Sequence, residues 1–133
     1  MSINNPFAKG NLMDIDIKET FDDMWSALDD KPDAYMLEVF EGITVGMTAF
    51  KTMFKTEKTF MDSPVPLQMA FATAALAMLE KAAKRGLFAF GAGFCFYIMW
   101  LMTMIMKKPD VKKHIEKCFD EKRNELFGGS MMA

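Results

Sequence analysis

Residues 86–106 read GLFAFGAGFCFYIMWLMTMIM and contain no charged side chain. As a helix, these 21 residues rise about 31 Å, which matches the hydrocarbon thickness of a bilayer, about 30 Å. A helix that is apolar around its whole circumference must be buried on every side, in lipid or in protein. Because a chain of 133 residues offers few other helices to surround it, we predict that this segment spans a membrane.

Basic residues flank this segment on both sides. Lys84 and Arg85 precede it, and Lys107 and Lys108 follow it, where their side chains can reach lipid headgroups. These four residues are therefore the predicted membrane-flanking positions.

A second uncharged stretch, residues 63–79, precedes the first and is shorter and rich in alanine. The six-residue link 80–85 separates the two stretches and carries three basic residues. A helical hairpin would keep both the N-terminal region and the basic tail on the cytoplasmic side, in agreement with the positive-inside rule. We therefore expect a membrane-embedded hairpin with cytoplasmic termini, and a single span is the alternative.

Small residues recur at helical spacing in both stretches and before them. Such residues let helix backbones approach closely where no hydrophobic force drives association. The sequence does not distinguish packing within one chain from packing between copies. The predicted helix-packing positions are Gly42, Gly46, Ala70, Ala74, Ala77, Ala89 and Gly93.

The remaining segments predict amphipathic helices and an all-α fold of about five helices. After an irregular arm over residues 1–20, apolar residues at helical spacing predict a short helix ending near Leu28. A heptad stripe follows, and a polar helix is expected over residues 110–127. We divide the chain into an acidic arm with amphipathic helices (1–62), the hairpin (63–107) and a basic tail (108–133). The heptad stripe consists of Met36, Phe40, Ile43, Met47, Phe50 and Phe54.

Charge is distributed unevenly along the chain, although the net charge is only −2. Residues 1–41 hold ten acidic residues against three lysines, whereas residues 80–133 hold ten basic residues against six acidic ones. This polarity suits a membrane surface or packing against other copies, and it does not suit nucleic-acid binding. No cleavable export signal is visible, so Cys95 and Cys118 are expected to be free thiols.

The sequence contains no recognisable catalytic, cofactor-binding or metal-binding motif. The single histidine, His114, lies among lysines and is expected to be solvated. The 15 methionines are explained more simply as pliable apolar filling than as copper ligands. We therefore expect neither an enzyme nor a cofactor, a metal site or a small-molecule substrate.

These observations favour a non-enzymatic structural or assembly subunit that is anchored in a membrane and packs into a larger complex. Its partners would be the lipid bilayer and copies of itself or other subunits. One alternative is a holin-like oligomer that forms pores. The other is a soluble oligomeric module in which residues 86–106 form the buried core.

Overall fold

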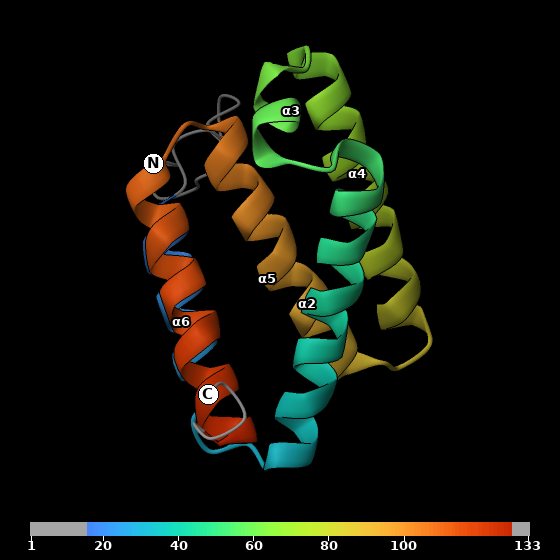
Figure 1. The fold of residues 1–133 in the computed structure, drawn as a ribbon. Helices are drawn as coiled ribbons and strands as arrows, with labels where there is room; N and C mark the ends of the chain where they lie inside the picture. The colour runs from blue at the N-terminus through green and yellow to red at the C-terminus, as the bar shows by residue number, and fades with distance from the viewer. Residues whose placement is uncertain (1–15, 129–133) are drawn as a thin grey trace, which may run out of the picture.

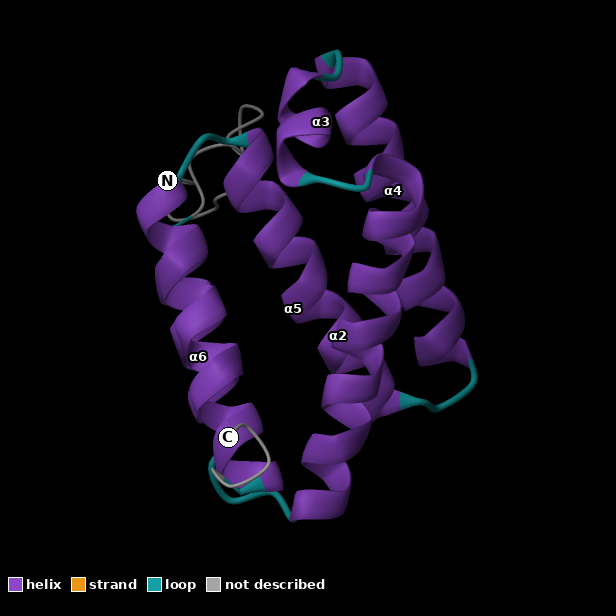
Figure 2. Cartoon of the chain, viewed as in Figure 1, coloured by secondary structure: helices purple, strands orange, loops and turns teal. Residues whose placement is uncertain are grey.

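Helices make up the fold of residues 16–128, the part of the chain that the computed structural model describes (Figures 1 and 2). The all-α prediction is confirmed for this part, with six helices where about five were expected and no strand. Most of the predicted N-terminal arm lies outside the described residues. The helices are α1 (Ile17–Ser26), α2 (Asp33–Phe54), α3 (Glu57–Asp62), α4 (Val65–Lys84), α5 (Phe88–Ile105) and α6 (Pro109–Phe127).

The apolar helix α5 lies in the middle of the bundle. Helices α2 and α4 cover one side of it, and α1 and α6 cover the other (Figure 1). Of the 18 residues of α5, 61% are buried. The other helices of this chain therefore bury much more of α5 than we expected from the chain length. Among the described residues α5 is the one helix long and apolar enough to cross a membrane, a test that a buried core helix also passes.

Aromatic rings hold α1 against α5 and α6. Helix α1 begins at Ile17, inside the stretch predicted to be irregular, because the Asp16 side chain accepts a hydrogen bond from the backbone N–H of Glu19, at 3.0 Å. Phe21 is fully buried, and its ring contacts Phe96 of α5 and Phe119 of α6. The short helix α1 is thus fixed by its apolar face.

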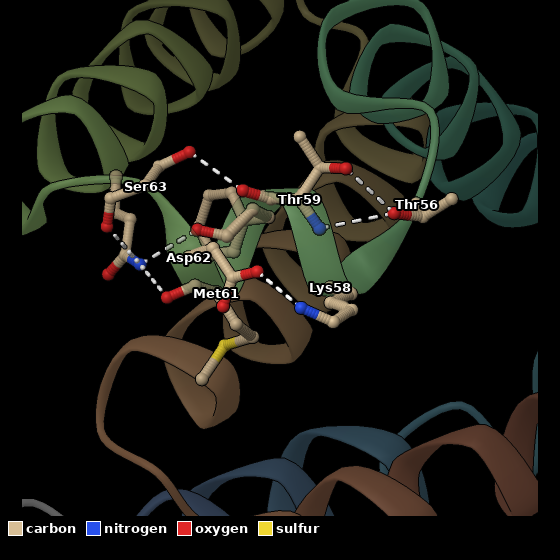
Figure 3. A network of polar contacts seen from close by, with 8 residues as sticks. Thr56, Lys58, Thr59, Met61, Asp62 and Ser63 are labelled. Carbon is tan, nitrogen blue, oxygen red and sulfur yellow. Dashed lines mark hydrogen bonds and ion pairs between the residues drawn. The ribbon is translucent and has the colours of Figure 1, made fainter.

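Helix α3 is the element that the sequence did not predict. Thr56 caps it by accepting a hydrogen bond from the N–H of Thr59, and Phe60 is fully buried beside Phe50 and Phe54 of α2. The polar contacts around this short helix are drawn in Figure 3. The buried amide of Gln68 donates to the carbonyl oxygen of Phe60 at 2.8 Å, so α3 also sets the rotation of α4.

The link between the two apolar stretches is largely helical. Helix α4 continues through residues 80–84, where Lys81 and Lys84 occupy its last turn and interact favourably with the helix dipole. A tight turn follows in which Gly86 has φ +73°, a conformation that glycine adopts without steric penalty. The antiparallel pair α4–α5 is therefore joined by only three residues.

Candidate interaction surface

Three of the predicted packing glycines bring α2 and α5 together inside the molecule. A Cβ atom added at Gly93 would lie 1.9 Å from the carbonyl oxygen of Val39, and one at Gly42 would lie 2.2 Å from that of Phe90. A Cβ at Gly46 would lie 2.4 Å from the ring of Tyr97. At Gly42 and Gly93 the two backbones therefore touch, and a side chain there would force them apart, whereas Gly46 leaves room for the ring of Tyr97. Ala89 is also buried in the core.

The predicted alanine stripe of α4 lies on the opposite side from this core. Ala70, Ala74 and Ala77 are exposed, whereas Ala72, Ala75 and Ala82 of the same helix are buried. The inward side of α4 is thus formed by these buried alanines, and the predicted stripe faces outward. Because residues 63–79 carry no charge on any side, hydrophobicity could not indicate which face turns inward.

We call the exposed side of this helix the α4 outer face. Along it, small residues form a central stripe with larger apolar side chains on both flanks, and Leu76 on one flank is 51% exposed. Contiguous exposed apolar surface of this kind marks an interaction site more often than isolated apolar residues do. The α4 outer face comprises Leu67, Met69, Ala70, Ala74, Leu76, Ala77 and Met78.

A hollow lies on each flank of the α4 outer face. A groove of about 310 Å³ between α4, α5 and the start of α1 is lined almost entirely by apolar side chains, four of them methionines. On the other flank, a cavity of about 110 Å³ reaches inward beside Ala74 and Met78 to Tyr97 of α5. Tyr97 is 1% exposed, and its hydroxyl has no hydrogen-bond partner within the described part of the chain.

The predicted membrane-flanking residues lie at opposite ends of α5. Lys84 and Arg85 end α4 at the turn before α5, and Lys107 and Lys108 lie between α5 and α6 (Figure 1). All four residues are exposed. Lys107, in the turn after α5, has φ +56°, a left-handed conformation that is uncommon for a residue other than glycine.

A buried indole connects α5 to a group of charged residues. The N–H of Trp100 donates to Glu116 Oε2 at 2.9 Å, and the same oxygen lies 2.8 Å from Lys112 Nζ. Lys112 also pairs with Glu57 at 2.7 Å. This group joins α3, α5 and α6 through one lysine that is shared by two carboxylates, which indicates a structural role.

Replacing Glu116 by alanine is expected to destabilise the protein by about 1–3 kcal/mol, because it leaves the buried N–H of Trp100 without an acceptor. The matched variant Glu116→Gln keeps an acceptor oxygen and removes only the ion pair, so its loss should be below about 1 kcal/mol. Urea unfolding followed by tryptophan fluorescence measures both. Equal losses for the two variants would contradict a structural hydrogen bond to Trp100.

His114 was expected to be solvated, but this α6 side chain packs against α1. Its Nε2 lies 2.6 Å from Asp22 Oδ1 and 3.9 Å from the sulfur of Cys118. A Cys–His pair activated by a carboxylate needs the acid and the thiol on different ring nitrogens, and here both face Nε2. Burial also raises the pKa of the Cys118 thiol. This arrangement is therefore unsuited to nucleophilic catalysis.

Asp22 gives the stability of the protein a small dependence on pH. Its hydrogen bonds with Lys18, at 2.9 Å, and with His114 lower the pKa of its carboxyl below the usual value of 3.8. The stabilisation is therefore complete above pH 3.8 and is lost as the pH falls through the lower folded-state pKa.

Asp22→Asn is expected to lower the free energy of unfolding at neutral pH by less than about 1 kcal/mol, since the pair is partly solvated. Thermal unfolding of both proteins from pH 7 to pH 2 measures the difference, which should vanish at the acidic end. A difference that grows towards acidic pH would contradict the depressed pKa of Asp22.

Within residues 16–128, no group of three or more His, Cys, Asp or Glu side chains is arranged to hold a metal ion. Comparison of the chain with protein-family models, with curated proteins and with solved structures finds no match in any of the three.

Proposed function

We propose that this protein is a non-enzymatic structural subunit that assembles into a larger complex through the α4 outer face. One observation carries the proposal: the most apolar helix, α5, is largely covered by its own chain, whereas the uncharged face of α4 is not. The surface left for a partner is therefore on α4.

Covering the α4 outer face supplies a substantial driving force. Leu67, Leu76 and Met78 are about half exposed, and burying the rest of each side chain contributes about 1 kcal/mol. The small residues between them let a partner helix approach closely, which adds van der Waals contact along the stripe.

The experiment compares Ala74→Glu with the wild type in detergent-free extracts, by size-exclusion chromatography with immunodetection of the chain. The wild type should elute well above its monomer mass of 15.1 kDa, and Ala74→Glu should elute as the monomer. The control is Ala27→Glu, which places the same charge at an exposed alanine after α1, across α5 from α4. A wild type that elutes as a monomer, or a variant of unchanged size, overturns the proposal.

Membrane anchoring is the second candidate, and the α4–α5 pair favours it. This pair is an antiparallel hairpin of two apolar helices, with Phe88 69% exposed and Leu87 48% exposed at its turn. Lipid would then cover the α4 outer face, and both termini would be cytoplasmic. A chain that stays with the membrane pellet through a carbonate wash until detergent is added supports this candidate. Complete recovery in the soluble fraction overturns it.

A further inference from the structure

We infer that the partner on the α4 outer face is a second copy of this chain, with the two α4 helices antiparallel about a twofold axis. The inference rests on the proposed function, in which this face is the interface. It identifies the occupant of that face and fixes the register of the contact.

The shape of the face suits its own symmetry mate. Ala70, Ala74 and Ala77 form an exposed stripe of small side chains, which serves as the channel of the face, and the larger Leu67 and Leu76 lie on its two flanks. In a twofold dimer the same patch must fit itself, so each copy supplies both the channel and the flanking ridges. The small stripe lets the two helix axes approach to about 8 Å, the lower end of the usual range.

The charges at the two ends of the helix select the antiparallel direction. The last turn of α4 and the turn after it carry Lys81, Lys84 and Arg85 against the single acid Glu80, whereas Asp62 lies just before the helix begins. A parallel pair would place the basic ends side by side, which is repulsive. An antiparallel pair separates the two basic ends and places each beside the other copy's turn between α3 and α4, where Asp62 of α3 is paired with Lys58 at 2.6 Å. It also opposes the two helix dipoles favourably.

The stripe of alanines sets the register. Setting Ala70 opposite Ala77, so that the small stripes coincide, places the twofold axis between Thr73 and Ala74. An interface centred there covers the uncharged length of α4 and leaves the charged residues at its rim.

The cavity beside the alanine stripe also favours a partner on this face, because it is lined by a buried tyrosine whose hydroxyl is unpaired in the described chain. Its exposed lining residues are Ala49 of α2 and Ala74 and Met78 of α4. Its buried lining includes Tyr97, whose hydroxyl has no partner in the described chain. Buried hydroxyl groups are nearly always hydrogen-bonded in folded proteins, to protein or to ordered water. The proposed axis passes beside Ala74, so a second copy would close the exposed side of the cavity that Tyr97 lines.

Light scattering on the purified full chain tests the oligomeric state. The expected mass is about 30 kDa, twice the 15.1 kDa of one chain. Ala74→Glu places two like charges at the axis and should weaken dimerisation at least about a hundredfold. Ala27→Glu should remain a dimer, and circular dichroism should show unchanged helix content in both variants.

Cysteine cross-linking tests direction and register, in a background that carries Cys95→Ala and Cys118→Ser. Ala74→Cys should form a disulfide with its own symmetry mate. Ala70→Cys alone should not, because its mate lies seven residues away along the helix, about 10 Å, beyond the reach of a disulfide. A mixture of Ala70→Cys and Ala77→Cys chains should form the mixed disulfide. In a parallel pair, Ala70→Cys would form a disulfide with its own mate, and the mixture of Ala70→Cys and Ala77→Cys would not form the mixed disulfide.

The outcomes separate this inference from the proposed function. A purified chain that is monomeric, or that cross-links in the parallel pattern, overturns the self-partner. If the chain nevertheless migrates in extracts as a larger species that Ala74→Glu abolishes, the proposed function stands and the partner is a different subunit. If Ala74→Glu changes neither measurement, both proposals fail.

Discussion

Replacing Gly93 by alanine is expected to lower the free energy of unfolding by about 3 kcal/mol, the upper part of the range for overpacking a core. The new Cβ would lie 1.9 Å from the carbonyl oxygen of Val39 and 3.0 Å from the backbone nitrogen of Ile43. Both are backbone atoms of α2, which cannot rotate out of the way as side-chain atoms can. Thermal unfolding followed by circular dichroism should show a midpoint lower by about 10 °C.

Gly91→Ala is the matched control, because it makes the same change two residues earlier in α5. The nearest atoms to a Cβ at Gly91 belong to the side chains of Leu79 and Ala82, at 3.5 Å and 3.8 Å, which is ordinary contact. Alanine should therefore be neutral there, or stabilising by up to about 1 kcal/mol through its helix propensity. Equal destabilisation by both variants would contradict the backbone contact between α2 and α5.

Phe21→Ala is expected to cost about 3–5 kcal/mol, as do other deletions of fully buried aromatic rings. Phe21 has 0% exposure, and its ring centroid lies 5.3 Å from that of Trp25 and 5.5 Å from that of Phe96. A helix of ten residues is too short to persist alone in water, so α1 depends on this contact. Urea unfolding should give the loss in stability, and hydrogen exchange should show faster exchange in α1 than in α5.

Phe88→Ala provides the comparison, since it deletes the same ring at a position that is 69% exposed. Its effect on the free energy of unfolding should stay within about 0.5 kcal/mol. If the amide protons of α1 remained protected from hydrogen exchange in Phe21→Ala, the proposed dependence of α1 on the Phe21 ring would be wrong.

The sequence predicted best those helices in which charged and apolar residues occupy different sides. Five of the six residues in the predicted stripe of α2 are buried, and Met47 is partly buried. The polar helix expected over residues 110–127 is observed as α6, one residue longer at its start. In both helices the pattern indicates the inward side directly.

The parts that were not predicted lack such a pattern. Helix α3 has six residues, too few for a periodic signal, and only Thr56 as a cap and Phe60 hint at it. Over residues 65–79 of α4, where every side is uncharged, the inward face is set by the buried hydrogen bond of Gln68 to α3, which the sequence does not reveal. The burial of α5 by its own chain depends on the close approach at Gly93. The sequence marked this residue as a packing position without identifying its neighbour.

The order of the helices along the chain favours early burial of α5 during synthesis on the ribosome. Both helices that make the main contacts with α5, α2 and α4, are synthesised before it. Since domains begin to fold during synthesis, the most apolar segment emerges when its two neighbours are already outside, and only α6 follows. The time during which α5 is exposed to aggregation, or to the machinery that inserts helices into membranes, is thereby shortened.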